Sequence, residues 1–153
     1  MSELDRFDRS ILSLLQGNAR MANTELAERV GLSPSACLRR VQRLEKVGII
    51  AGYVALLDPQ AVGRASTVFI EVTLQSQSEE ALAAFEQAAS ACPDILECQL
   101  MAGDFDYLLR IAVPSPQEYE RVHKRELSRL PHVMRIKSLF ALRTVIKRTD
   151  YPL

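Results

Sequence analysis

The chain has 153 residues, and its 19 basic and 19 acidic side chains give a formal net charge of zero. This length fits one domain or two small ones, and 48% hydrophobic with 25% charged residues excludes a globally disordered chain. No run approaches about 18 apolar residues and the N-terminus is acidic, so we expect no membrane span, no secretory signal and a cytoplasmic protein. Zero net charge also argues against nucleic acid as a partner, unless the charges are unevenly distributed.

The first 58 residues predict three helices. Apolar spacing indicates a first helix from Asp5 to Gln16, and a second from about Thr24 to Val30 with Asn23 as its N-cap. The third begins at Ser33-Pro34, where serine caps and proline fits the first helical position, and it runs to about Val47 before Gly48. Ile49 to Leu57 is then expected to be extended.

The third helix carries a local excess of positive charge. At about 100° per residue, Cys37, Val41 and Leu44 form an inner stripe with Leu38 beside it, and the outward side is polar and basic. Residues 33–47 hold four basic residues and one acidic residue. Such a run of charged residues is most often simply the solvent-exposed face of a helix. A short helix, a tight Gly-Leu-Ser turn and a second helix, however, are typical of a helix-turn-helix, whose second helix enters the DNA major groove.

The sequence therefore predicts that this region binds double-stranded DNA. Serine hydroxyls and the N–H groups at the helix start suit a phosphate oxygen, and arginine can bridge guanine edges or neutralise phosphate. We expect Ser35, Arg39 and Arg43 to contact DNA bases or phosphates, and Arg40 and Lys46 to contact the DNA backbone. The predicted DNA-binding residues are Asn23, Ser33, Ser35, Arg39, Arg40, Arg43 and Lys46.

Residues 66–153 predict a β-α-β-β-α-β order, the ferredoxin-like pattern. The expected strands are Ser66–Gln75, about 96–101, Tyr107–Val113 and Val133–Ile146, and the expected helices are Glu79–Ala91 and 116–130. Leu96, Cys98 and Leu100 should alternate with Glu97, Gln99 and Met101. Two helices on one face of an antiparallel sheet leave the other face to be covered, which predicts an oligomer.

The segment from Met101 to Tyr107 is the best candidate for a small-molecule site. Asp104 and Asp106 lie two residues apart beside Gly103, and two carboxylates could accept an α-ammonium group while glycine allows close approach of a ligand. The alternative is a tight hairpin, because Gly-Asp is a common turn pair.

No residue pattern indicates catalysis or a metal. Cys37, Cys92 and Cys98 form no CxxC pair and are interpreted as reduced, small buried hydrophobes, with a Cys92–Cys98 bridge as the alternative. His123 and His132 have no second ligand at metal spacing. No nucleotide-binding, zinc-protease or serine-hydrolase motif occurs. We expect no cofactor and no enzyme; an enzyme or enzyme-regulatory subunit using the Asp pair, or a nonspecific DNA-wrapping protein, are the alternatives.

Three stretches resemble the bacterial Lrp/AsnC family of leucine-responsive and asparagine-related regulators. They are residues 5–16, 23–45 and 48–59, and the second contains the specific run Leu-Ser-Pro-x-x-Cys-Leu-x-Arg-Val-x-x-Leu-Glu. The resemblance extends over nearly the whole chain. It implies an α+β protein with a (winged) helix-turn-helix domain in residues 1–58, a linker in 59–65 and an ACT-like effector-binding and oligomerisation domain in 66–153.

The resemblance also implies a function. It is that of a sequence-specific transcriptional regulator that responds to an amino acid or related metabolite and controls amino-acid metabolism or transport genes. In the family the C-terminal sheet forms dimers, which assemble into tetramers or octamers, and the effector binds between dimers near the position of Asp106. The effector residues expected here are Leu100, Met101, Gly103, Asp104, Asp106, Tyr107, Ser138, Leu139, Phe140 and Ala141.

The distribution of charge removes the initial argument against DNA. Residues 1–58 hold eight basic and seven acidic groups, and residues 59–153 hold eleven and twelve, so neither part is notably basic. The excess is confined to one helix, which a dimer would present twice. We therefore expect specific, multivalent DNA binding with weak nonspecific affinity.

Overall fold

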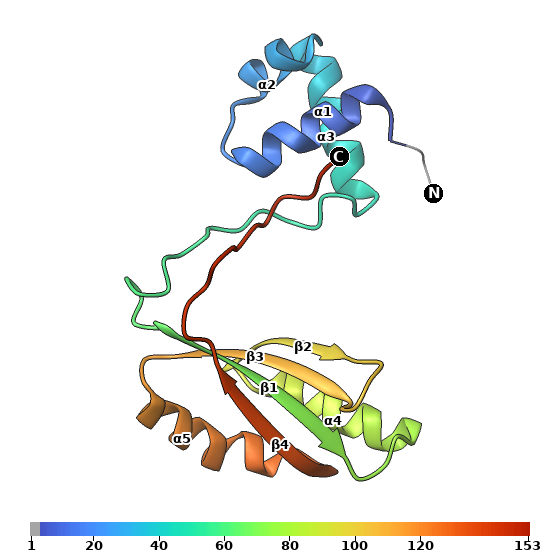
Figure 1. The fold of residues 1–153 in the computed structure, drawn as a ribbon. Helices are drawn as coiled ribbons and strands as arrows, with labels where there is room; N and C mark the ends of the chain where they lie inside the picture. Colours follow the sequence, from blue (N-terminus) through green and yellow to red (C-terminus); the bar gives the residue numbers. More distant parts are fainter. Residues whose placement is uncertain (1–3) are drawn as a thin grey trace. The chain divides into compact units, whose positions relative to one another are not determined.

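The computed structural model describes residues 4–153, which form two compact units (Figure 1). One unit contains the chain as far as Leu56 together with Val145–Leu153, and the other is Leu57–Thr144. The division lies close to the expected boundary at residue 58, but the last nine residues group with the first unit. Among the described residues, no helix is long and apolar enough to cross a membrane.

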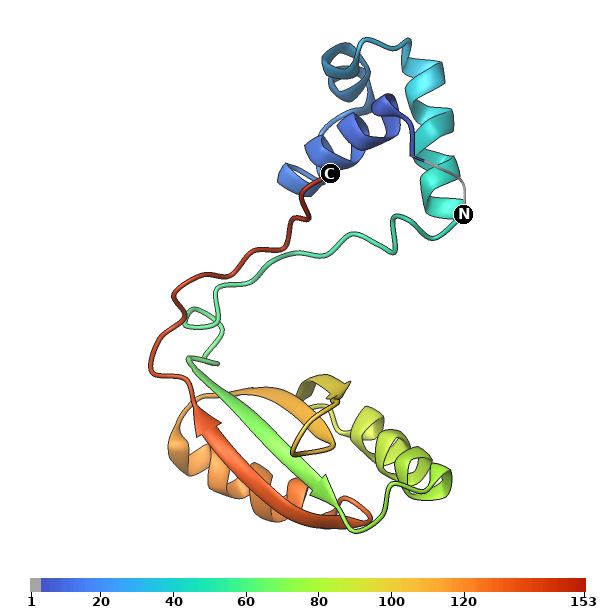
Figure 2. The same cartoon turned by 45° about the vertical axis from the view of Figure 1, so that its right-hand side comes forward.

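The first unit is built from three helices: α1 (Arg6–Gly17), α2 (Asn23–Val30) and α3 (Pro34–Lys46) (Figure 2). Each contributes one apolar face to a small common core. The buried members of this core are Ile11, Leu12, Leu26, Ala27, Cys37 and Leu44. The C-terminal segment joins the same unit, where the Gln16 side chain donates to the Tyr151 carbonyl at 3.0 Å and accepts from the Tyr151 N–H at 2.6 Å.

The starts of the helices differ in how they are capped. Ser33 caps α3 with Pro34 in the first turn, which confirms that prediction. The prediction for α2 was wrong: Ala22 is its N-cap, and Asn23 is the first helical residue. The Asn23 side chain instead donates to the Pro34 carbonyl at 2.9 Å, so it joins the start of α2 to the start of α3.

The helix-turn-helix turn depends on one glycine. Gly31 has φ +72°, a left-handed conformation that L side chains rarely adopt. It lets the Leu32 N–H reach the Ala27 carbonyl at 2.9 Å, which closes α2 and directs the chain into α3. After α3 and Gly48, residues 51–58 form no strand, so the expected extended segment provides no β-paired wing within the described chain.

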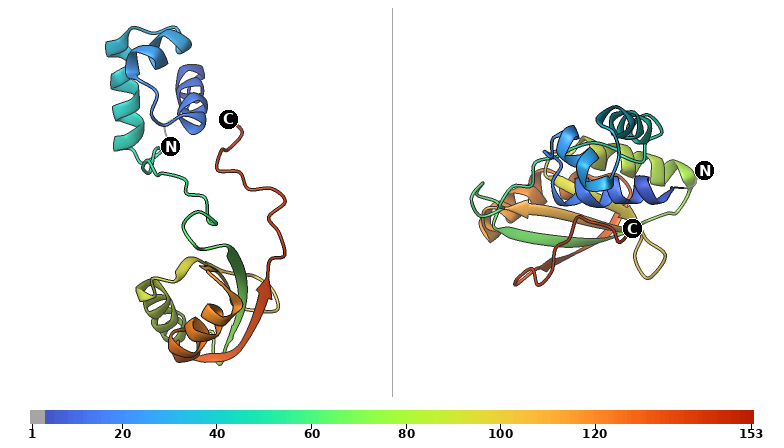
Figure 3. Two further views of the ribbon diagram at one scale, coloured as in Figure 1. Left: turned by 90° about the vertical axis from the view of Figure 1, so that its left-hand side faces the viewer. Right: turned by 90° about the horizontal axis from the view of Figure 1, so that it is seen from above.

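The second unit is a four-stranded antiparallel sheet in the order β2-β3-β1-β4. Its strands are β1 (Ser66–Leu74), β2 (Ile95–Leu100), β3 (Tyr107–Val113) and β4 (Val133–Phe140). The helices α4 (Glu79–Ala91) and α5 (Pro116–Arg125) both cover one face of the sheet (Figure 3). This is the predicted β-α-β-β-α-β order, and no helix of the described second unit covers the opposite face of the sheet.

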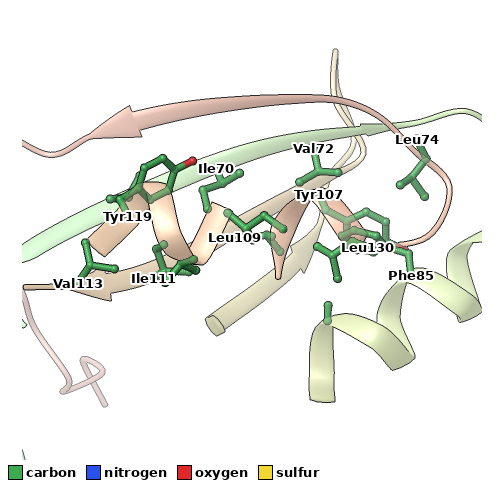
Figure 4. Close-up of a cluster of buried hydrophobic side chains, with 14 residues drawn as sticks. Ile70, Val72, Leu74, Phe85, Tyr107, Leu109, Ile111, Val113, Tyr119 and Leu130 are labelled. Carbon is green, nitrogen blue, oxygen red and sulfur yellow. The ribbon is translucent and has the colours of Figure 1, made fainter. Parts of the chain in front are cut away.

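The core of this unit lies between the sheet and the two helices (Figure 4). Every second residue of the central strands is buried, as the two-residue period of a strand requires: Val68, Ile70, Val72 and Leu74 in β1, and Tyr107, Leu109, Ile111 and Val113 in β3. From the helices, Phe85 packs its ring 4.4 Å from that of Tyr107. Figure 4 shows Tyr119 at the other end of the same layer.

The edges of this unit depart from the predictions. After Ile95, every residue of strand β2 is exposed, so neither face of this strand is buried in the chain. Cys98, which lies in β2, is therefore exposed and not buried as predicted, whereas Cys37 and Cys92 are buried as predicted. The three described cysteines are all reduced. Strand β4 ends at Phe140 rather than near 146, because its partner β1 begins at Ser66 and the last bond joins the Ala141 N–H to the Thr67 carbonyl.

The expected helix to residue 130 ends early. Helix α5 stops at Arg125, and Leu127–Arg129 form a 3-10 turn, labelled η1. Residues three apart eclipse one another in a 3-10 turn. This tighter winding directs both Leu127 and Leu130 into the core.

Candidate functional site

The outward face of α3 presents two basic groups without partners in the described chain. The side chains of Ser35, Arg39 and Lys46 are exposed, and neither Arg39 nor Lys46 has a hydrogen bond or ion pair with any residue of the range 4–153. They lie on the side opposite the buried Cys37 and Leu44. This face therefore carries positive charge that is available to an external anion such as a DNA phosphate.

The other two predicted arginines are paired with α1. Arg43 donates to Asp8 Oδ2 at 2.5 Å, and Arg40 donates to Asp8 Oδ1 at 2.9 Å and to Asp5 Oδ2 at 2.7 Å. Asp8 is buried, with 1% of its surface exposed. Nothing in the periodicity of α1 indicated that its acidic residues would meet α3, because these pairs join positions 32 to 35 residues apart.

The same acidic residues cap α1. The Asp5 side chain accepts from the Phe7 and Asp8 N–H groups at 2.9 Å, and Asp8 accepts from the Asp5 N–H at 3.3 Å, which completes a capping box. Hydrogen bonds from the Asp8 backbone and the Arg40 guanidinium lower the pKa of Asp5 against the opposing effect of desolvation. Hydrogen bonds from Arg40 to Asp5 and Asp8 raise the pKa of Arg40, so the Arg40–Asp5 pair stays charged at neutral pH.

The start of α3 gathers the remaining DNA candidates. The Ser33 hydroxyl accepts from the Ala36 N–H at 3.3 Å and lies 3.3 Å from the Ser35 hydroxyl. Asn23 joins them through the Pro34 carbonyl. These three polar side chains surround the N-terminus of α3, where unpaired N–H groups and the helix dipole attract an anion.

Leu38 was wrongly predicted to lie beside the inner stripe of α3. It is 46% exposed. It lies one position before Arg39, on the flank of the outward face. An exposed apolar side chain on such a helix suits the thymine methyl group in the major groove. Hydrophobicity alone could not identify it, because the same residue type fills the core.

In the predicted effector loop, the Asp106 carboxylate points inward. Its Oδ2 accepts from the Leu74 N–H at 2.7 Å and its Oδ1 accepts from Gln77 Nε2 at 2.6 Å, and only 6% of the residue is exposed. Its backbone N–H donates to the Val72 carbonyl at 2.9 Å. Asp106 therefore fixes the end of β1 to the loop, a role that its spacing from Asp104 in the sequence did not indicate.

The neighbours of Asp106 divide into buried and exposed groups. Tyr107 is 1% exposed and donates its hydroxyl to Glu86 at 2.7 Å; burial and the charge of Glu86 raise the pKa of its phenol. Asp104 and Gly103 are exposed, in a connection of residues 101–106 that is longer than the tight hairpin considered as the alternative. A Cβ at Gly103 would meet open space within this chain.

The candidates of the last strand lie at the opposite edge of the sheet. The β2-β3-β1-β4 order separates Leu100 and Met101, at the end of β2, from Ser138, Leu139, Phe140 and Ala141 in and after β4. Ser138 hydrogen-bonds Tyr119, and Phe140 packs edge-on against the same ring with centroids 5.1 Å apart. A single chain thus does not bring the ten effector candidates together.

The cavities of the second unit lie away from the predicted effector residues. Three surface cavities in the second unit have volumes of about 430, 260 and 370 Å³, and none is lined by an effector candidate. Within residues 4–153, no group of three His, Cys, Asp or Glu side chains is placed to hold a metal ion.

Comparison with known proteins assigns both units. Residues 4–45 match the model of an AsnC-type helix-turn-helix domain, and residues 67–151 match that of an Lrp/AsnC ligand binding domain. The chain is 46% identical over 131 residues to the leucine-responsive regulatory protein of Escherichia coli K12, covering 86% of this chain and 80% of that protein.

Solved structures share the fold over nearly the whole chain. A transcriptional regulator from Neisseria meningitidis, solved as an L-Met complex, has a TM-score of 0.92 and 35% identity, with 98% of this chain and 97% of that chain covered. An AsnC family regulator from Agrobacterium tumefaciens has a TM-score of 0.91 and 39% identity, with 97% and 96% covered. The similarity covers both units in the same order.

Proposed function

The chain belongs to the Lrp/AsnC family of transcriptional regulators, and on that basis we propose that it binds specific double-stranded DNA through α3 and responds to an amino acid. The family consists of DNA-binding regulators rather than enzymes. The observation that carries the DNA-binding proposal is the outward face of α3, where Arg39 and Lys46 are exposed and have no partner within residues 4–153. A dimer would present two such helices about 34 Å apart, which favours a pseudo-palindromic operator.

The proposed effector is an amino acid that binds between subunits. The Neisseria relative was solved with L-methionine, and the effector candidates of this chain lie at opposite edges of one sheet. Residues from two chains therefore have to meet if these candidates form one site. The exposed Asp104 carboxylate is the group of the loop that is available to an α-ammonium, since Asp106 is committed to Leu74 and Gln77.

The helix-free face of the sheet is the proposed dimer surface. Phe69 lies on this face at the centre of β1, opposite Leu139 of β4 and Arg110 of β3. Ion pairs at the same face, Lys137–Glu71 at 3.1 Å and Arg110–Glu97 at 2.6 Å, surround the apolar residues. Apolar centre and charged surroundings are typical of a protein interface.

Phe69→Asp is expected to dissociate the dimer, because it places a charge at the centre of the buried surface. Light scattering after size-exclusion chromatography measures the mass. Gln117→Asp, on an exposed position of α5, adds the same charge elsewhere and should leave the mass unchanged. A folded Phe69→Asp protein with the wild-type mass would contradict the proposed interface.

Two measurements test the proposed function. Footprinting on DNA flanking the gene should show protection of a discrete site that random DNA does not compete away, because base contacts distinguish operator from random sequence. In a thermal-shift screen of the twenty amino acids, an amino acid that binds the native state should raise the melting temperature of the protein. Binding of random and flanking DNA with equal affinity would favour a nonspecific DNA-wrapping protein instead.

A further inference from the structure

The most deeply buried charge in the DNA-binding unit belongs to Asp8. Only 1% of the surface of Asp8 is exposed. Its carboxylate faces Arg40 and Arg43 of α3, the helix proposed to read the DNA and called the reading helix below. Both oxygens are used, because Oδ1 accepts from Arg40 and Oδ2 from Arg43. A carboxylate is costly to bury without partners, and the two guanidinium groups offset that cost here.

Arg40 is held more firmly than Arg43. Besides Asp8, it donates to Asp5 at 2.7 Å, and its guanidinium carbon lies 5.3 Å from the centre of the Phe7 ring. The Arg40 side chain is 29% exposed and that of Arg43 is 45% exposed. Arg43 therefore lies at the margin of the outward face, within reach of solvent but paired on its inner side.

We propose that Asp8 sets the DNA specificity of this protein, because it holds Arg40 and Arg43 against α1 and so withholds two of the four positive charges of the reading helix from DNA phosphates. This proposal rests on the proposed function of α3. Phosphate contacts add affinity for any sequence, whereas contacts with base edges distinguish sequences. A helix whose extra charges are neutralised internally binds random DNA weakly, and the exposed Arg39 and Lys46 remain for the operator.

The alternative role of Asp8 is to aim Arg43 at the DNA. In that case the carboxylate would support a contact with phosphate or base, and its loss would weaken all DNA binding. The two roles predict opposite changes for random DNA, so one variant distinguishes them. Asp8→Asn keeps the size of the side chain and removes its charge.

The experiment measures the affinity of full-length wild type and Asp8→Asn for operator and random duplexes over a range of salt concentrations. Each added phosphate contact steepens the dependence of log K on log salt by about 0.9. For random DNA we expect a slope steeper by about 1 to 2 per reading helix and an affinity about tenfold higher at low salt. The ratio of operator affinity to random affinity should fall accordingly.

Two further variants serve as controls. Glu118→Gln makes the same change of charge and releases Arg121 from an exposed pair on α5, and it should leave the slope unchanged. Asp8→Asn combined with Arg43→Gln should return the slope toward the wild-type value, which a general loss of structure would not do. Asp5→Asn should give a smaller effect than Asp8→Asn, because Arg40 keeps its pair with Asp8. The cap of α1 should survive, because asparagine caps helices as well as aspartate does.

The outcomes are distinct. An unchanged or weaker affinity for random DNA, in an Asp8→Asn or Asp5→Asn protein with wild-type circular dichroism, would overturn the proposal. A wild-type protein that does not distinguish operator from random DNA would instead refute the proposed function. A steeper slope that reverts in the double variant supports the assignment of Asp8.

Discussion

Arg39→Ala is expected to abolish operator binding at physiological salt while the oligomer stays intact. Arg39 is exposed on the outward face of α3 and has no partner in the described chain, so its guanidinium is free to contact base or phosphate. Loss of such a contact costs about 1–3 kcal/mol per reading helix, so a dimer loses about 2–6 kcal/mol, which lowers the affinity for the operator by about 30-fold or more. Gel-shift titration on the protected site measures the change.

Two comparisons make this result specific. Arg121→Ala removes an exposed arginine from α5, where it pairs with Glu118, and should leave operator affinity unchanged. Arg43→Ala should cost less than Arg39→Ala, because its guanidinium is already paired with Asp8. An Arg39→Ala protein that binds the operator within threefold of wild type would remove Arg39 from the DNA interface.

Asp106→Ala should lower the free energy of unfolding by about 2–4 kcal/mol, because it leaves the Leu74 N–H and the Gln77 amide without their acceptor. Urea unfolding followed by circular dichroism measures the loss. This expectation changes the meaning of any lost effector response in the variant, since a displaced loop would produce the same effect as a missing contact.

Asp104→Ala is the matched control for that prediction. Its carboxylate is exposed and has no hydrogen bond within the described residues, so its removal should change stability by less than about 0.5 kcal/mol. If the loop contacts the ammonium of an amino acid, Asp104→Ala should lose the thermal shift without loss of stability. Wild-type stability of Asp106→Ala would contradict the structural role assigned to Asp106.

Local chemistry determined most of the architecture. The Ser33-Pro34 start of α3, the αL turn at Gly31 and the alternating burial of Val68, Ile70 and Val72 all follow from neighbouring residues. Each of these features depends on steric preference or periodicity over a few residues, which is why the order of elements could be predicted.

The family was also accessible from the sequence. The run from Leu32 to Glu45 resembles the Lrp/AsnC helix-turn-helix closely, and the two matching domain models cover residues 4–45 and 67–151. The basic face of α3 was identified by the same helical spacing. Sequence therefore determined what kind of protein this is and which helix carries the positive charge.

The tertiary structure decided how those charges and carboxylates are used. Four basic residues of α3 look equivalent in the sequence, but Asp5 and Asp8, which lie 32 to 35 positions away in the chain, neutralise Arg40 and Arg43. Asp104 and Asp106 also look equivalent, yet one is exposed and the other is buried against Leu74 and Gln77. The reason is physical: periodicity specifies which face of its own element a residue occupies, whereas ion pairs and burial depend on which distant element packs against that face.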